Sequence, residues 1–270
     1  MEPASFEREA TLASDAWNPE VYGRFRDERA QPFFDLLALV RPRPGMRAVD
    51  LGCGTGALTA EAHRRLGARE TTGIDSSAAM LEKALPLAGG GLSFAQEDIG
   101  SFGPPAREGY DLVLSNAALQ WLPDHPALLA RITSALAPGG QLAVQVPAND
   151  RHPSHRLAHA LALEEPFASA LRGYVRGKPV LEPEDYAVLL RGLGYREQHV
   201  RTQVYLHELG AAADVADWVR GTLLTDYERR LPRGLWDRFL STYQERLVAS
   251  LPPQRPYLYT YPRILFWASR

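Results

Sequence analysis

Short apolar runs alternate with segments of helical periodicity through the first 146 residues. Phe33, Phe34, Leu37 and Val40 share one helical face, which predicts a helix over residues 27–40. The apolar runs predict strands at residues 47–51, 70–74, 92–96, 110–114 and 141–146. The segments between them predict helices at 57–66, from Ser76 or Ser77 to Leu85, and at 126–136, the last stopped by Pro138-Gly139-Gly140. This alternation predicts a doubly wound parallel α/β sheet.

The second half of the chain shows a different pattern. Residues 147–182 are rich in proline and arginine and less regular. Beyond them we expect helices at 183–193, 212–223 and 235–251 and strands at 195–207 and 263–268. The two strands are expected to pair with each other.

Composition narrows the class of protein. The chain has 270 residues, 45% hydrophobic and 23% charged, as in an ordinary globular protein. A net charge of -2 argues against a protein that binds nucleic acid backbones. Cys53 is the single cysteine, so neither a disulfide scaffold nor a cysteine-rich zinc site is expected, and we predict no metal. No secretion signal and no apolar stretch of membrane-spanning length is seen, so we expect a cytoplasmic protein without a membrane partner.

Charge is unevenly divided along the chain. Residues 1–150 carry 13 basic and 19 acidic side chains, or -6, whereas residues 151–270 carry 17 and 13, or +4. This division suggests that the two parts meet ligands of different sign.

A glycine-rich loop, Val49-Asp50-Leu51-Gly52-Cys53-Gly54-Thr55-Gly56, joins the first predicted strand of the sheet to its helix. Glycines at this place allow a tight turn and let a ligand approach the backbone. Asp75 and Asp98 end the next two strands. Because ligands of open α/β sheets lie across the carboxyl ends of the strands, three acids are predicted to line one crevice.

The acids favour a nucleoside ligand. We expect Asp75 to accept hydrogen bonds from two ribose hydroxyls. We expect Asp98 to accept one from an adenine amino group, with the Ile99 amide facing a ring nitrogen. Either acid alone is also explained as a helix N-cap or a solvated loop acid. Their joint placement at matching strand ends favours the crevice.

Two kinds of cofactor fit such a crevice. The spacing Gly52-x-Gly54-x-x-Ala57 satisfies the fingerprint of dinucleotide-binding proteins, which makes an NAD-binding dehydrogenase the alternative. Asp50 weighs against it, because a carboxylate two residues before the first glycine disfavours a pyrophosphate and favours a cation. Asp98 has no natural role in dinucleotide binding.

The loop, the two acids and the turn Leu136-x-Pro138-Gly139-Gly140 together resemble the class I S-adenosylmethionine-dependent methyltransferases. Further segments are similar to the trans-aconitate 2-methyltransferases. These are Trp17-Asn18-Pro19-x-x-Tyr22, Gly73-Ile74-Asp75-Ser76-Ser77-x-x-Met80, Ser115-Asn116-Ala117-x-Leu119-Gln120-Trp121-Leu122-Pro123-Asp124-His125, Leu142-Ala143-Val144-Gln145-Val146-Pro147, Asp217-Trp218-Val219 and Pro262-Arg263. Residues 151–182 depart from the family pattern.

The resemblance implies a Rossmann-like seven-stranded sheet with the last strand antiparallel. Because the proline-rich insertion after the fifth strand lies outside the cofactor motifs, we also predict a helical cap. The chain is thus divided into an N-terminal tail and cap helix (1–44), an S-adenosylmethionine-binding core (45–146), and a cap insertion with extra helices and an antiparallel strand pair (147–270). The residues expected to bind the cofactor are Arg29, Asp50, Gly52, Cys53, Gly54, Gly56, Asp75, Ser76, Met80, Asp98, Ile99 and Asn116. Arg29 is assigned to the methionine carboxylate, although it is equally explained as a solvated charge.

The implied reaction is O-methylation of a carboxylate on a small polyanionic acid, with trans-aconitate first to test and another small molecule as the alternative. A carboxylate is already ionised at neutral pH, so no general base is expected. We expect Asn116, Gln120 and Trp121 to face the methyl group and orient the acceptor. Further candidates for acceptor contacts are Trp17, Tyr22, His125, Tyr186, Tyr257 and Arg263. We expect a monomer or weak homodimer.

Overall fold

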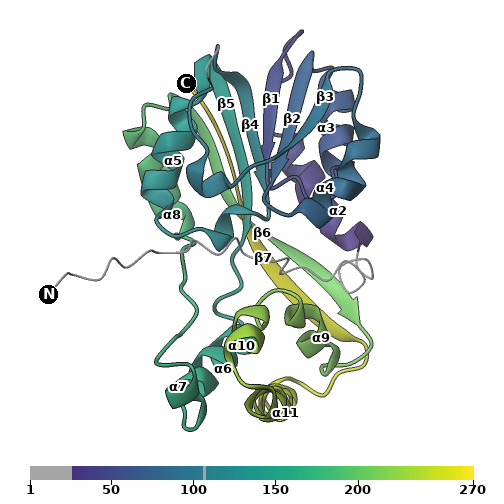
Figure 1. The fold of residues 1–270 in the computed structure, drawn as a ribbon, viewed down its shortest axis with the longest axis vertical. Helices are drawn as coiled ribbons and strands as arrows, with labels where there is room; N and C mark the ends of the chain where they lie inside the picture. Colours follow the sequence, from purple (N-terminus) through teal and green to yellow (C-terminus); the bar gives the residue numbers. More distant parts are fainter. Residues whose placement is uncertain (1–25, 106–107) are drawn as a thin grey trace, which may run out of the picture.

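The computed structural model describes residues 26–105 and 108–270. Trp17 and Tyr22 therefore lie outside the described residues. The structure has a sheet lobe with helices on both faces and a smaller helical lobe (Figure 1). Two long strands, β6 (Glu197–Leu209) and β7 (Tyr257–Ser269), run from the sheet into the helical lobe.

All seven strands form one sheet in the order β3-β2-β1-β4-β5-β7-β6. The first five are β1 (Arg47–Leu51), β2 (Glu70–Asp75), β3 (Leu92–Gln96), β4 (Tyr110–Asn116) and β5 (Leu136–Pro147). Strands β1 to β5 pair in parallel, and β7 is antiparallel to both β5 and β6. The predictions of a seven-stranded α/β sheet with its last strand antiparallel, and of a paired β6 and β7, are confirmed.

Helices cover both faces of the sheet and fill the second lobe. The helices of the sheet lobe are α2 (Arg26–Leu37), α3 (Ala57–Leu66), α4 (Ala78–Ala84), α5 (His125–Ser134) and α8 (Pro183–Gly192), with single turns η1 (Leu85–Leu87), η2 (Ile99–Ser101) and η3 (Leu119–Trp121). The helical lobe holds α6 (Pro153–Ala162), α7 (Phe167–Ala170), α9 (Asp214–Arg220), α10 (Thr225–Arg230) and α11 (Arg233–Ser250). No helix among the described residues is both long and apolar enough to cross a membrane.

Local sequence explains the ends of these helices. The Ser77 hydroxyl accepts a hydrogen bond from the Met80 amide at 3.2 Å and caps α4. Gly67 ends α3 in the left-handed conformation, with φ +56°. Proline stands in the first turn of α6 and α8, where a backbone N–H would have no hydrogen-bond partner within the helix, so its absence costs nothing.

The helical lobe is held by aromatic packing around the ribbon of β6 and β7. Tyr227 stacks on Phe239 with ring centroids 5.3 Å apart, and Trp218 lies edge-on to Tyr259 at 5.8 Å. Alternate residues of β7 point into this core, since Tyr257, Tyr259 and Tyr261 are buried. The ribbon is therefore shared by both lobes.

Several predicted boundaries are wrong. Pro138-Gly139-Gly140 does not end a helix, because α5 stops at Ser134 and these residues lie in the irregular start of β5. The segment 147–182 is more regular than expected, since α6 and α7 form there. Strand β7 begins at Tyr257 rather than residue 263, and α10 forms where no helix was predicted.

Candidate functional site

The glycine loop is tied to the neighbouring strand β2. The Gly52 and Cys53 amides both donate to the Ile74 carbonyl, at 2.8 and 2.9 Å. A Cβ on Gly52, where φ is +81°, would lie 2.3 Å from the Ala118 Cβ after β4. The loop thus needs glycine at this position to approach the end of β4. By contrast, a Cβ on Gly54 meets nothing within 4 Å, so this part of the loop faces open space.

Asp75 ends β2 and joins the loop to α4. Its Oδ2 accepts a hydrogen bond from the Gly54 amide at 2.8 Å, and its Oδ1 accepts one from Ser77 at 2.9 Å. The side chain remains half-buried. Each carboxylate oxygen has capacity for a further donor, so the carboxylate can still receive hydroxyl groups from a ligand.

Asp98 and Ile99 stand at the rim of the crevice after β3. The exposed Asp98 accepts a hydrogen bond from the Gly100 amide at 2.8 Å and caps η2. This is the capping role that the sequence left open beside adenine binding. The Ile99 Cδ1 lies 3.4 Å from the place that a Cβ on Gly52 would occupy, so Ile99 reaches over the glycine loop.

Asp50 lies under the loop and is 4% exposed. The Thr59 hydroxyl donates to its Oδ2 at 2.6 Å. Burial raises the pKa of Asp50 to about 6; the Thr59 hydrogen bond opposes this rise, and the nearby Asp75 adds to it. The position makes Asp50 a buried carboxylate that a cation above the loop would hold ionised.

We expect Asp50→Asn to stabilise the ligand-free protein at pH 7.5 by about 3 kcal/mol. The folded protein holds the Asp50 proton more tightly than the unfolded chain, whose pKa is near the ordinary value of 3.8. The protonated Asp50 side chain therefore stabilises the folded protein fully below pH 3.8, and this contribution is lost as the pH rises through 6. Urea unfolding of both proteins between pH 5 and 7.5 measures the difference, which should grow with pH. An equal difference at every pH would contradict the assignment.

The remaining predicted cofactor residues are placed around these acids. Cys53 and Met80 are buried beside α4, and Ser76 is exposed. Burial, with Asp50 and Asp75 nearby, raises the pKa of the Cys53 thiol, which disfavours a thiolate. Arg29 lies in α2, and its side chain is outside what the structure describes.

The end of β4 is sharply bent. Ala117 has φ +54°, a left-handed conformation that is strained for alanine, and the side-chain Nε2 of Gln120 donates to the Ala117 carbonyl at 2.7 Å. The Asn116 Oδ1 and Gln120 Oε1 are buried acceptors with no hydrogen-bond partner in the described structure. Trp121 is half-buried, with the Arg176 guanidinium 4.5 Å from its ring centroid. The three residues predicted to face the methyl group, Asn116, Gln120 and Trp121, therefore all lie at the carboxyl end of β4 or in the turn that follows it.

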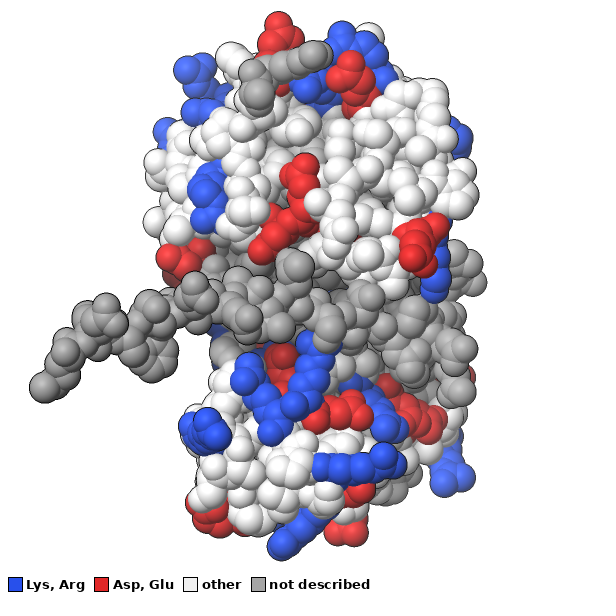
Figure 2. All heavy atoms as spheres, viewed as in Figure 1, with Lys and Arg blue, Asp and Glu red and all other residues white. Residues whose placement is uncertain are grey.

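Arg176 belongs to the cap insertion and links it to the sheet lobe. Besides Trp121, it meets Asp226 of the helical lobe at 3.9 Å. Figure 2 shows basic side chains over the helical lobe, with acidic side chains among them on the part nearest the sheet lobe.

The structure separates the predicted acceptor contacts. Arg263 lies at the carboxyl end of β5, opposite Pro147. His125 and Tyr186 are buried and hydrogen-bonded to each other, so they join α5 to α8 rather than facing the crevice. Burial lowers the pKa of His125. Tyr257 packs in the core of the helical lobe, six residues along β7 from Arg263.

Two buried residues after β4 were not singled out as site residues by the sequence. Gln145 accepts a hydrogen bond from Arg263, and the Asn149 amide donates to the Tyr259 hydroxyl. The Gln145 Nε2 and the Asn149 Oδ1 lack partners within the described residues. Gln145 lies opposite Asn116 in the register of β4 and β5. A glutamine within the otherwise apolar run Leu142–Val146 was the available signal.

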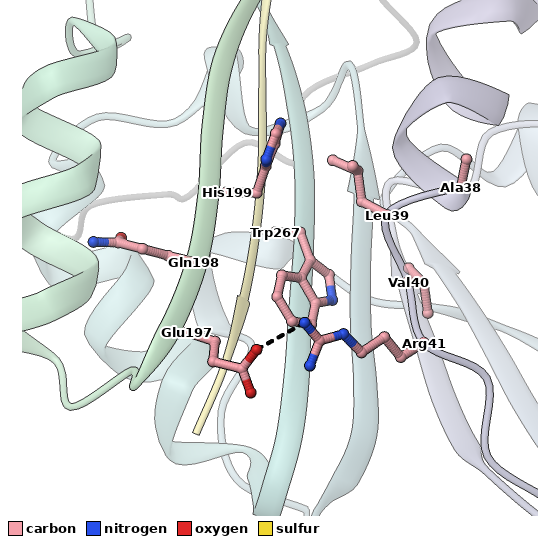
Figure 3. Close-up of a pocket in the computed structure, with 8 residues that line it drawn as sticks. All are labelled: Ala38, Leu39, Val40, Arg41, Glu197, Gln198, His199 and Trp267. Atoms are coloured by element: carbon pink, nitrogen blue, oxygen red, sulfur yellow. Dashed lines mark ion pairs between the residues drawn. The ribbon is translucent and has the colours of Figure 1, made fainter.

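A separate hollow of about 410 Å³ lies where β6 begins and β7 ends, beside the chain that follows α2 (Figure 3). The Arg41 guanidinium lies 4.5 Å from the Trp267 ring centroid and pairs with Glu197 at 2.7 Å. None of the predicted site residues lines this hollow. The candidate site is therefore taken to lie at the carboxyl ends of β1 to β5, apart from this hollow.

The chemistry of this crevice fits S-adenosylmethionine. The buried, unpartnered oxygens of Asn116 and Gln120 need donors, which an ammonium group supplies. The half-buried Asp75 suits hydroxyls, and the open space at Gly54 admits a ligand to the backbone. No group of three or more His, Cys, Asp or Glu side chains forms a metal-binding cluster among the described residues.

A Rossmann-like sheet with a glycine loop and acids at successive strand ends defines a nucleoside-cofactor-binding α/β enzyme. A family model described as "Methyltransferase domain" matches residues 22–200. Trans-aconitate 2-methyltransferases from Deinococcus radiodurans and Paracidovorax citrulli are 46% and 39% identical to this chain, each covering 94% of it and 98% of the relative. The chain therefore belongs to the methyltransferase-domain family and, within it, to the family of these relatives.

Structural similarity agrees with this membership. A phosphoethanolamine N-methyltransferase from Haemonchus contortus, solved with S-adenosylhomocysteine, has a TM-score of 0.53 and 19% identity. The alignment covers 89% of this chain and 52% of that one, and it shows a shared fold. The sequence-based predictions of an S-adenosylmethionine-dependent methyltransferase and of its family are confirmed, and the dehydrogenase alternative is set aside.

Proposed function

We propose that the protein transfers the methyl group of S-adenosylmethionine to one carboxylate of trans-aconitate and forms a methyl ester. One observation carries this proposal: two relatives named trans-aconitate 2-methyltransferase align with 94% of this chain and with 98% of their own length. The match thus includes the helical lobe and β7 as well as the cofactor motifs. A small-molecule acceptor also agrees with the net charge of -2, which does not favour a nucleic acid.

The cofactor is assigned to the crevice described above. Asp75 receives the ribose hydroxyls, the rim residues Asp98 and Ile99 receive adenine, and Asn116 receives the ammonium group. Asp50 lies beneath the loop and contributes negative charge. Bound there, S-adenosylmethionine supplies a methyl group already activated by its sulfonium.

The protein's contribution is therefore positioning and exclusion of water. A carboxylate oxygen of the acceptor forms a bond to the methyl carbon as the carbon–sulfur bond breaks, and the bonding electrons stay on sulfur. The acceptor carries no proton that must be removed, so no enzyme base is needed. His125 does not offer one, because it is buried and bonded to Tyr186 and to the Leu119 carbonyl.

Incubation with methyl-labelled S-adenosylmethionine and trans-aconitate tests the proposal. We expect a labelled product that mild alkali hydrolyses, as it does any methyl ester, and a rate that falls in acid as the carboxylates become protonated. Succinate and an uncharged alcohol of similar size serve as comparison acceptors. An alkali-stable product, or turnover of the alcohol with none of trans-aconitate, would overturn it.

A further inference from the structure

Arg263 is a buried guanidinium without an acidic partner in the described structure. It is 6% exposed and forms no ion pair with any described residue. Its Nη1 donates to the Gln145 Oε1 at 3.2 Å, and its Nε is buried without a hydrogen-bond partner. An uncompensated buried charge is unfavourable, so the site is suited to an anion.

The surroundings of Arg263 do not neutralise it. The ring of Tyr261 lies 4.7 Å and that of Tyr205 6.0 Å from its guanidinium carbon. Burial and the adjacent Asp35 raise the pKa of Tyr205, which keeps the phenol neutral. Asp35 itself accepts hydrogen bonds from the Tyr205 hydroxyl and from Gln203, at 2.7 and 2.8 Å. Its carboxylate is thus engaged with these neighbours and makes no ion pair with the arginine.

Gln145 provides a second buried donor without a partner in the described part of the chain, next to the Arg263 guanidinium. The Gln145 Nε2 belongs to the amide that orients Arg263, and it too is buried without a partner among the described residues. Two donors from hydrogen-bonded side chains match the two oxygens of a carboxylate. Gln145 lies opposite Asn116, the last residue of β4, and the next turn holds Gln120 and Trp121, which are expected to face the methyl group, so this pair of donors borders the predicted reaction centre.

We propose that Arg263, oriented by Gln145, binds a carboxylate of the acceptor that is not methylated. The inference rests on the function proposed above. A carboxylate held by an arginine fork has its charge neutralised and its oxygens occupied, which disfavours nucleophilic attack. The pair therefore anchors the acceptor while another carboxylate, nearer β4, reacts. The protein then requires an acceptor with at least two carboxylates.

Arg263→Gln tests this anchor. We expect kcat/KM for trans-aconitate to fall about 100-fold, mainly through KM, with the dissociation constant of S-adenosylhomocysteine changed less than twofold. Because the variant loses an uncompensated buried charge, its melting temperature should stay unchanged or rise. A purely structural arginine would instead lower it. Arg263→Lys should recover part of the loss, since it restores charge without the fork.

Arg41→Gln is the matched control, because Arg41 also lies over an aromatic ring of β7 but already pairs with Glu197. It should leave kcat/KM unchanged. An unchanged KM in Arg263→Gln, or an equal loss of S-adenosylhomocysteine binding, would overturn the anchor. If that variant does not fold, Gln145→Leu decides: a KM raised about tenfold supports the anchor, and an unchanged one refutes it.

Calorimetry separates this inference from the proposed function. Trans-aconitate is titrated into the S-adenosylhomocysteine complexes of the parent protein and of Arg263→Gln. Binding that is lost in the variant supports the carboxylate anchor even where the parent protein gives no turnover, a result that would refute the proposed function alone. Equal binding by both proteins, or no binding by either, overturns the anchor.

Discussion

Gly52→Ala is expected to weaken binding of S-adenosylmethionine more than 100-fold. The new Cβ would lie 2.3 Å from the Ala118 Cβ, far inside any carbon–carbon contact, so the loop must move away from β4. That movement separates the backbone from the place where the cofactor has to approach it. Calorimetry with S-adenosylhomocysteine measures the loss.

Gly67→Ala is the control for this substitution. Gly67 has φ +56° and open space around it at the end of α3, so alanine there costs about 1–2 kcal/mol of left-handed strain and nothing more. We expect a lower melting temperature with unchanged affinity. If both substitutions reduced the affinity equally, backbone strain alone, and not the contact with Ala118, would explain the weaker cofactor binding.

Asp75→Ala is expected to weaken cofactor binding by at least about 100-fold. Each charged hydrogen bond lost to a ribose hydroxyl costs about 1.5–3 kcal/mol, and the variant also releases the Gly54 amide from the loop. Calorimetric titration of the folded variant with S-adenosylhomocysteine gives the change.

The matched control for Asp75→Ala is Asp111→Ala, which removes a carboxylate that accepts from the Arg47 amide at 2.9 Å, near the start of β4. Its effect should be confined to stability. Unchanged affinity in Asp75→Ala would refute the ribose assignment.

The sequence predicted buried elements better than elements shared between lobes. Strands β1 and β3 and helix α3 have the predicted bounds, because their patterns depend on local burial. Strand β7 was found only in part, since Pro262 interrupts the apolar run and its alternating tyrosines face a second core. Helix α6 was missed because its proline was read as irregular chain, although proline is favoured in the first turn.

The candidate site divides in the same way. The glycine loop and Asp75 follow single strands, so spacing along the chain was sufficient to predict them. Gln145 and Arg263 are 118 residues apart, and their contact depends on the antiparallel pairing of β5 with β7. For the same reason the sequence could not show that Arg263 lies near the end of β5 while His125, Tyr186 and Tyr257 lie elsewhere. Those placements depend on how the elements pack.

The position of β7 between β5 and β6 has a consequence for synthesis of the protein on the ribosome. Strands β1 to β5 are joined in parallel to one another and are complete by Pro147, and only β5 has a further partner, β7, so this part of the sheet can form while the rest is still being translated. Strand β6 has no partner until β7, residues Tyr257–Ser269, emerges. A nascent chain therefore acquires the cofactor crevice early and gains Arg263 only when its last strand has left the exit tunnel.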